Sequence, residues 1–186
     1  YYQTCEPENR WTNLYYMHEL YCAGHLIEGA VAYYEATGKR RFLDIMCRYA
    51  DHIYKRIGKE EGKIKSYCGH PEIELALVKL YKATGNEKYL ELSKYFIDER
   101  GTQPYYFELE SLMRGVDTTK TANQKRHLKY FLRSRGPYAE YQAHKPVREQ
   151  DEPVGHAVRA MYLYSGMADI AAYYDDDALY NACCRI

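Results

Sequence analysis

Apolar residues recur at three- and four-residue steps along much of the chain. In the first such run they are Leu20, Ala23, Ile27, Ala30, Val31 and Tyr34. This spacing predicts an α-helix that buries one stripe of its surface, and Gly38 is typical of the position just past a helix end. A second run from about Arg40 to Gly58 has the same spacing, so the two runs predict a helical hairpin.

The hairpin recurs at a shift of about 47 residues. The matching residues are Tyr34, Ala36, Thr37, Gly38, Leu43 and Asp51 in the first copy and Tyr81, Ala83, Thr84, Gly85, Leu90 and Asp98 in the second. The repeat predicts a second hairpin from about Pro71 to Arg100. A more divergent third unit runs from Val154 to a turn at residues 175–177 and a short helix that ends near Cys184.

Hairpins that repeat at this period cannot each bury an apolar face alone, so they stack into a solenoid or close into a ring. A ring of six would need about 280 residues, whereas the chain has 186. The chain also opens in the middle of a pattern and stops without a closing cap. We therefore expect an all-α fold that is a fragment of a larger one.

Residues 102–153 interrupt the repeat. They are polar and weakly periodic, apart from a short helix predicted over His127 to Leu132. A segment of this length inside a compact domain is more often a functional loop than a linker. We expect it to form a long loop at the rim of the helical domain.

The composition narrows the classes of partner. Lys and Arg number 26, as do Asp and Glu, so the net charge is zero and neither nucleic acid nor an anionic membrane is an expected partner. No window approaches the roughly 18 apolar residues of a membrane span. The 23 tyrosines suit polar ligands such as sugars, although a tyrosine-rich core is an equal alternative. The scattered cysteines favour free thiols in a reducing compartment such as the cytoplasm.

Three histidines lie near the starts of the first helices of their units. His18 follows Thr12-Asn13, a pair suited to capping a helix, while His70 and His156 precede the first helices of the second and third units. Because the first helices of stacked hairpins run parallel, we expect the three to line one end of the fold, with His144 on a preceding loop able to fold over it. Imidazoles there could bind a hydroxyl-rich or anionic ligand, although a single histidine at a helix start is usually solvated or a local cap.

Two further groupings have residue types that bind metals or act as thiolates. His18, Cys22 and His25 share one helical face, but a fourth ligand is missing and cysteine is also a common core residue. The thiols of Cys183 and Cys184 point to different faces of a terminal helix, so we expect one to be packed and the other exposed. Neither grouping predicts a metal site.

Glycoside hydrolysis typically needs two carboxylates beside a cleft. The candidates are Glu19, Glu72, Glu74, Glu149, Asp151 and Glu152. Glu72 and Glu74 follow Pro71 at a predicted helix start, where the helix dipole explains them. The run at residues 148–152 is typical of a solvated loop, so the sequence alone selects no catalytic pair.

Four strings are distinctive enough for comparison with known families. They are residues 18–28 (HELYCAGHLIE), 69–77 (GHPEIELAL), 142–150 (QAHKPVREQ) and 155–166 (GHAVRAMYLYSG). Together they resemble the bacterial β-L-arabinofuranosidases of glycoside hydrolase family 127, over nearly the whole chain.

The resemblance implies an (α/α)6 barrel with added β-domains, of which residues 1–186 would form an incomplete part and residues 102–153 a rim loop. It also implies a retaining exo-enzyme that releases L-arabinofuranose from β-linked arabinosides, with an arabinofuranoside or other carbohydrate as its partner. The family's nucleophile is a cysteine thiolate held at a zinc ion, with a glutamate as acid/base and a second glutamate among the metal ligands.

The chain departs from this pattern at the reaction centre. The family's Glu-x-Cys stretch, its Cys-Cys zinc pair and its acid/base glutamate lie downstream of the matched segment, and Cys183 matches a cysteine of an earlier barrel helix. The resemblance therefore assigns no catalytic residue, metal ligand or cofactor to this chain. It does carry over the sugar-contacting histidines: His18, His70, His144 and His156.

We therefore expect part of the sugar pocket of a β-L-arabinofuranosidase, inactive by itself and without stoichiometric zinc. The alternative is a helical-repeat binding scaffold for a glycan or peptide. In either case an incomplete ring exposes apolar helix edges, which favours self-association.

Overall fold

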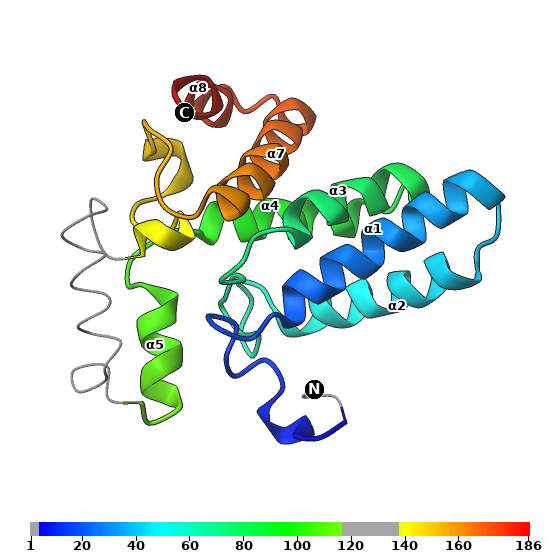
Figure 1. The fold of residues 1–186 in the computed structure, drawn as a ribbon, viewed down its shortest axis with the longest axis horizontal. Coiled ribbons are helices and arrows are strands. Elements are labelled where there is room, and N and C mark those ends of the chain that lie inside the picture. Colours follow the sequence, from blue (N-terminus) through cyan, green and yellow to red (C-terminus); the bar gives the residue numbers. More distant parts are fainter. Residues whose placement is uncertain (1–3, 117–137) are drawn as a thin grey trace.

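The computed structural model describes residues 4–116 and 138–186 (Figure 1). Its α-helices are α1 (Glu19–Thr37), α2 (Arg41–Arg56), α3 (Ile73–Thr84), α4 (Glu87–Glu99), α5 (Tyr106–Met113), α7 (Ala157–Tyr174) and α8 (Asp177–Arg185). Three short 3-10 helices lie at Pro7–Asn9, Ala139–Tyr141 and Val147–Glu149. No strand occurs within the described ranges, which confirms the all-α prediction. None of the described helices combines the length and apolar character needed to cross a membrane.

The predicted hairpins are present as α1–α2, α3–α4 and α7–α8. The first two end their first helix in the same way: Gly38 has φ 69° and Gly85 has φ 71°, a left-handed conformation that suits glycine. The N–H of each donates to a carbonyl four residues earlier, at 2.7 Å in both hairpins. In the third unit Asp175 takes this position with φ 48°, so the turn persists without its glycine. The structure therefore confirms the repeat.

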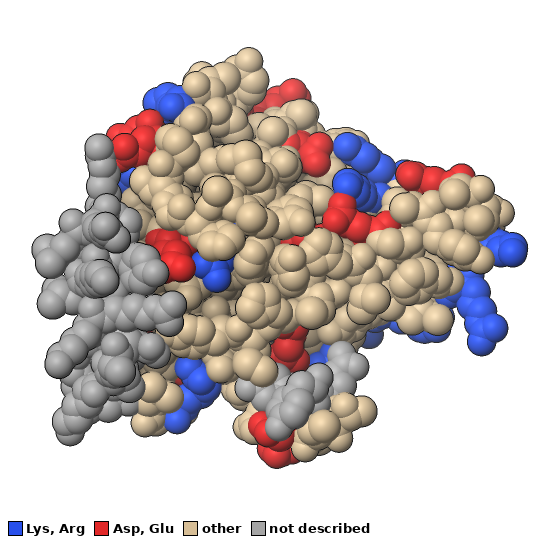
Figure 2. Space-filling model, in the orientation of Figure 1, with Lys and Arg blue, Asp and Glu red and all other residues tan. Residues whose placement is uncertain are grey.

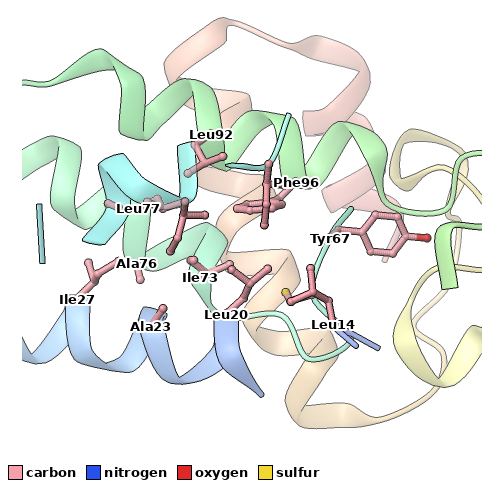
Figure 3. Packing of buried hydrophobic residues seen from close by; sticks show 14 of the residues in the cluster. Leu14, Leu20, Ala23, Ile27, Tyr67, Ile73, Ala76, Leu77, Leu92 and Phe96 are labelled. Carbon is pink, nitrogen blue, oxygen red and sulfur yellow. The ribbon is translucent and has the colours of Figure 1, made fainter. Parts of the chain in front are cut away.

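The first helices of the hairpins lie in a row, with α3 between α1 and α7 (Figure 1). Figure 3 shows Ala23 and Ile27 of α1 facing Ala76 and Leu77 of α3, with the side chains of α4 on the other side of α3. Leu77 is fully buried, so truncating it to alanine should cost about 2–5 kcal/mol. The packed stripes hold the starts of these helices at one end.

The third unit packs on the second through a separate apolar cluster. Its members are Val78, Leu90, Ile97, Val147, Leu163, Met167, Ile170, Ala171, Leu179 and Ala182. Gly166 of α7 lets that helix approach α3 closely, because a Cβ there would stand 3.1 Å from the Cβ of Glu74. The three hairpins therefore form one continuous stack.

The expectation of a loop over residues 102–153 missed α5. The buried residues of this helix are Tyr106, Phe107, Glu110 and Ser111. Two of the four are polar, so the apolar spacing that identifies other helices is hidden here. The short helix predicted over His127 to Leu132 lies outside the described residues.

The surface agrees with a chain of zero net charge. Figure 2 shows basic and acidic side chains interspersed around a largely uncharged face. Several large apolar side chains are nonetheless exposed, among them Leu26 of α1 and Val158 and Met161 of α7.

Candidate functional site

Three helix starts bring His18, His70 and His156 together, and we call these residues the histidine rim. The ring centroids of His18 and His70 are 5.8 Å apart, and those of His70 and His156 are 5.9 Å apart. His18 and His156 are the N-cap residues of α1 and α7, while His70 lies just before α3. The gathering at one end follows from the parallel first helices, as predicted.

The predicted cap of the first helix is wrong. The helix begins at Glu19, and its N-cap residue His18 makes no side-chain capping bond. Thr12 and Asn13 instead shape the preceding turns, where the Asn13 side chain accepts from the N–H of Tyr16 at 3.3 Å. The residue types that cap helices also form turns, and here Thr12 and Asn13 belong to turns that end before the helix begins.

Tyrosine rings stand against the rim. The ring of Tyr21 lies 4.4 Å from that of His70, and the ring of Tyr162 lies 6.0 Å from it. A cavity of about 10 Å³ beside His18 and His70 has room for roughly one water molecule. A ligand larger than a water molecule would therefore lie across the rim rather than inside this cavity.

The hydrogen bonds of the rim fix complementary roles for two imidazoles. His70 Nδ1 lies 2.9 Å from the carbonyl oxygen of Pro71. A carbonyl only accepts, so Nδ1 carries the hydrogen and Nε2 of a neutral ring is an acceptor. His156 Nδ1 instead accepts from the N–H of Arg159 at 3.4 Å, which leaves its Nε2 as a donor. The pair can thus accept from one ligand hydroxyl and donate to another.

His70 is neutral at pH 7. Burial lowers the pKa of its imidazole to about 4, and the positive charge of Arg159 acts in the same direction. The bond to the Pro71 carbonyl opposes the shift without cancelling it. His70 therefore offers hydrogen bonds rather than a positive charge, which suits a neutral polyhydroxyl ligand.

His144 stands apart from the other three histidines. Its carbonyl accepts from the Tyr105 hydroxyl at 2.9 Å, and its half-buried ring has no ring contact with the rim among the described residues. Burial lowers the pKa of this imidazole as well. The structure thus brings together three of the four predicted histidines.

A buried arginine joins the loops that carry His70 and His156. Arg100 is fully buried. Its guanidinium donates to the carbonyls of Cys68 at 2.8 Å and Tyr141 at 2.9 Å. The next residue, Gln142, donates through Nε2 to the carbonyl of His156 at 3.3 Å. Nothing in the sequence marked this arginine, because arginine is rarely buried and its partners are distant along the chain.

Glu72 and Glu74 lie at the start of α3, as the helix-dipole interpretation expects, but that interpretation did not predict their burial. Both side chains are fully buried. Glu74 pairs with Arg100 at 3.1 Å between Oε1 and Nη2. Helix α3 begins at Ile73, so Glu72 is the N-cap residue and Pro71 precedes the helix.

The carboxylate of Glu72 faces the first helix. Its Oε1 lies 3.6 Å from Nδ1 of His25, whose Nδ1 is also 3.7 Å from Oε2 of Glu28. Burial, followed by the nearby Glu28, raises the pKa of Glu72 to about 10. The metal alternative with His18 and Cys22 is not the one observed: among the described residues, the one group of three or more potential ligands with atoms within 4.8 Å is His25, Glu28 and Glu72.

Two of the remaining candidate carboxylates make local contacts. Glu19 accepts from the N–H of Trp11 at 2.9 Å, and Asp151 pairs with Lys145 at 2.7 Å. The run at residues 148–152 is not wholly solvated, because Arg148 pairs with Asp98 at 2.8 Å.

Cys183 and Cys184 do not fit the zinc ligands that the family resemblance implies. Cys183 packs against the apolar cluster of the third unit, and burial raises the pKa of its thiol. Cys184 is exposed, as predicted for adjacent thiols on a helix. A cysteine that binds zinc does so as a thiolate. The packed, protonated thiol of Cys183 therefore does not suit that role.

The comparisons with known proteins agree with the geometry. A family model described as "Beta-L-arabinofuranosidase, GH127 catalytic domain" matches residues 2–186. A relative, the non-reducing end β-L-arabinofuranosidase of Bifidobacterium longum subsp. longum, is 39% identical over 176 residues, which are 95% of this chain and 25% of that protein.

Solved structures give the same result. A crystal structure of a GH127 β-L-arabinofuranosidase from Geobacillus stearothermophilus T6 matches with a TM-score of 0.90 and 56% identity, over 100% of this chain and 27% of that one. Another GH127 β-arabinofuranosidase matches with a TM-score of 0.74 and 44% identity, over 95% of this chain and 23% of that one. The chain thus spans about a quarter of the length of these relatives. On this match of family model, sequence and fold, the chain belongs to the catalytic-domain family of the GH127 β-L-arabinofuranosidases.

Proposed function

We propose that this chain supplies part of the sugar pocket of a retaining glycoside hydrolase that releases L-arabinofuranose from β-linked arabinosides. The observation that carries the proposal is the histidine rim, three imidazoles held at adjacent helix starts in a member of this family. Residues 1–186 form part of the catalytic barrel, and residues 102–153 belong to its rim.

The rim recognises the sugar through paired hydrogen bonds. Nε2 of His70 accepts from one furanose hydroxyl and Nε2 of His156 donates to another oxygen, while His18 and the Tyr21 ring border the same space. Each such bond contributes about 0.5–1.5 kcal/mol net. At about 1 kcal/mol for each bond, three or four of them give a Kd on the order of 1 mM or weaker, so the pocket wall alone binds sugar weakly.

The described residues supply no covalent chemistry in this proposal. The thiol of Cys183 is packed and protonated rather than activated, and the buried Glu74 is held in its ion pair with Arg100. The chain alone should therefore bind arabinofuranosides without hydrolysing them.

NMR titration with methyl β-L-arabinofuranoside tests the binding. We expect shifts of the His18, His70 and His156 ring signals at millimolar ligand, and loss of those shifts in His70→Ala. His52→Ala on α2 is the matched control and should bind as the parent chain does. Sugar binding that is unchanged in His70→Ala would refute the role of the rim.

A hydrolysis assay tests the second part of the proposal. The purified chain with an aryl β-L-arabinofuranoside should release no aglycone above the rate of buffer alone. Turnover that survives repeated purification would contradict the proposal that the described residues of this chain supply no covalent chemistry.

One observation supports the alternative of a glycan- or peptide-binding scaffold. A hollow of about 760 Å³ between α1 and α2 is lined by Arg10, Arg48 and Tyr49 and reaches His18. A ligand held there would shift the signals of Arg48 and Tyr49 and leave His70 unaffected, so the same NMR titration separates the two functions. A shift of the His144 ring signals in the sugar titration would add this histidine to the residues that contact the sugar.

A further inference from the structure

We propose that His25, Glu28 and Glu72 form a binding site for one divalent transition-metal ion of the Zn²⁺ type. One imidazole nitrogen and two carboxylate oxygens face one another across α1 and the start of α3. The site is independent of sugar binding and of the cysteine ligands that the family resemblance places elsewhere. It departs from the expectation that this chain holds no metal ligand.

The distances suit a metal ion. Nδ1 of His25 is 3.7 Å from Oε2 of Glu28 and 3.6 Å from Oε1 of Glu72. With metal–ligand bonds of about 2.0–2.1 Å, two ligand atoms of a tetrahedral site stand about 3.4 Å apart. Shifts of a few tenths of an ångström would therefore bring the imidazole into register with each carboxylate, and all three ligand atoms already lie within 4.8 Å of one another.

The burial of Glu72 also points to a bound cation. Its side chain is 0% exposed, and among the described residues no N–H group hydrogen-bonds to either carboxylate oxygen; the Glu28 carboxylate beside it can be joined to it only through a shared proton or a cation. A buried carboxylate without a partner is costly. His25 and the carboxylate of Glu28 face the Glu72 carboxylate. A cation between the three groups would accept lone pairs from all of them.

Gly24 of α1 lies directly against the Glu72 carboxylate. A Cβ at Gly24 would stand 1.4 Å from Oε2 of Glu72. Only glycine allows α1 to pass so close to the Glu72 side chain, which fixes the carboxylate against the helix that carries His25 and Glu28. The carboxylate therefore lies in a fitted space between the two helices.

Access and charge are also compatible with an ion. The side chains of His25 and Glu28 are 40% and 24% exposed, which leaves a route from solvent and a place for a water as the fourth ligand. Lys79 contacts Oε1 of Glu28, whereas Oε2 faces His25. The lysine thus leaves the inner oxygen available, although its positive charge opposes a cation.

The site is separate from the histidine rim. The ring of Tyr21 stands between the two, 4.4 Å from His25 on one side and 4.4 Å from His70 on the other. The ring of Tyr162 also contacts both histidines, at 5.8 Å and 6.0 Å. A metal ion bound at His25 would therefore lie behind the tyrosines that border the rim.

Titration of the 186-residue chain with Co²⁺, followed by its visible absorption, tests this site. Co²⁺ replaces Zn²⁺ in similar geometry, and its spectrum reports tetrahedral nitrogen and oxygen ligands and separates them from thiolates. We expect saturable binding of one ion per chain without a thiolate charge-transfer band. His25→Ala and Glu72→Gln should each weaken binding at least tenfold, since even changes beyond the ligands cost about 10- to 100-fold.

Matched variants sharpen the test. Glu35→Gln, on the exposed part of α1, should bind Co²⁺ as the parent chain does. Lys79→Ala should bind it several-fold more tightly, because a positive charge beside Glu28 is removed. That gain of affinity cannot come from a variant that merely unfolds.

Three results would overturn the proposal. The first is the absence of saturable Co²⁺ binding to the parent chain, in which case Glu72 simply holds a proton. The second is equal binding by the parent chain, His25→Ala and Glu72→Gln. The third is a strong thiolate band, which would place the ion at cysteine instead.

Discussion

Glu72 and Glu74 lie two residues apart at the start of α3, and both side chains are fully buried. Glu74 meets the guanidinium of Arg100, which also binds the backbone of two loops. Glu72 meets an imidazole and a second carboxylate. The same residue type at the same depth thus has two different environments, because successive side chains at a helix start point toward different neighbours.

The difference shows that two equally buried glutamates near the histidine rim can have different roles, depending on whether a cation is paired with them. The Arg100–Glu74 pair satisfies its own charge and holds the loops that carry His70 and His156. The Glu72 side chain is positioned as firmly, by packing against Gly24, but among the described residues no Lys or Arg forms an ion pair with it, and its raised pKa keeps the carboxyl group protonated. The environment of Glu74 stabilises the fold, whereas the environment of Glu72 can hold a proton or a cation.

Breaking the paired environment should have the largest effect. Arg100→Leu leaves the Glu74 carboxylate buried without its cation, and we expect a loss of about 3–5 kcal/mol in the free energy of unfolding. Urea denaturation measures this loss. The double variant Arg100→Leu/Glu74→Gln should recover part of it, because the orphaned charge is gone.

A loss below about 1 kcal/mol in Arg100→Leu would contradict the pairing. It would mean that the arginine and Glu74 are both stabilised by other groups. The histidine rim would then lose its proposed support, and the ring signals of His70 and His156 should stay unchanged in the variant.

Glu110 provides an intermediate case, a buried carboxylate satisfied by backbone donors. It accepts from the N–H groups of Leu14 at 2.7 Å and Tyr15 at 3.1 Å. Burial nevertheless raises its pKa to about 7 from an ordinary 4.5, since two N–H groups do not replace full hydration.

The contribution of Glu110 to the free energy of unfolding should therefore fall as pH rises from 4.5 to 7. In that window the folded chain keeps the Glu110 proton that the unfolded chain releases, so ionisation favours unfolding. The full difference is about 3 kcal/mol, and it is absent below 4.5 and constant above 7. Urea denaturation of the parent chain and of Glu110→Gln at pH 5 and pH 7.5 isolates it; equal pH dependence in both would refute this prediction.

His70 should show the opposite sign with a smaller effect. Its folded pKa of about 4 lies below the ordinary 6.5, so the stability it contributes is present above pH 6.5 and is lost as pH falls toward 4. Because the ring is half-buried, solvent screens part of this effect. NMR titration of the imidazole should give a midpoint near pH 4, and a midpoint above 6 would show that the ring is solvated.

Sequence patterns predicted the three hairpins because each has an apolar stripe and a turn residue at a fixed place. Gly38 and Gly85 fill the same left-handed position, and Asp175 replaces them in the third unit. The parallel first helices then required His18 and His70 to meet at one end. This part of the site followed from topology alone.

The polar interior did not follow from the sequence. A glutamate at a helix start is usually solvated, and nothing in the local sequence distinguishes Glu72 or Glu74 from that case. The partner of Glu74 is Arg100, 26 positions along the chain. Helix α5 was missed for a related reason, since its buried Glu110 reads as a surface residue. Long-range pairs of charged groups leave no periodic signal.

The smallest effect is expected from Glu72→Gln in buffer with a chelator, where we predict a change below about 1 kcal/mol in the free energy of unfolding. Glutamine keeps the shape of the side chain and, like the protonated carboxyl group of Glu72, can donate a hydrogen bond to Glu28. Glu74→Gln is the matched control two residues away, and it should cost about 3 kcal/mol because it leaves Arg100 without its anion. If the two variants lose equal stability in urea denaturation, the contrast between a paired and an unpaired carboxylate does not hold. A large loss in Glu72→Gln alone would instead place a fixed positive partner beside Glu72, and such a partner would also exclude a cation from that position.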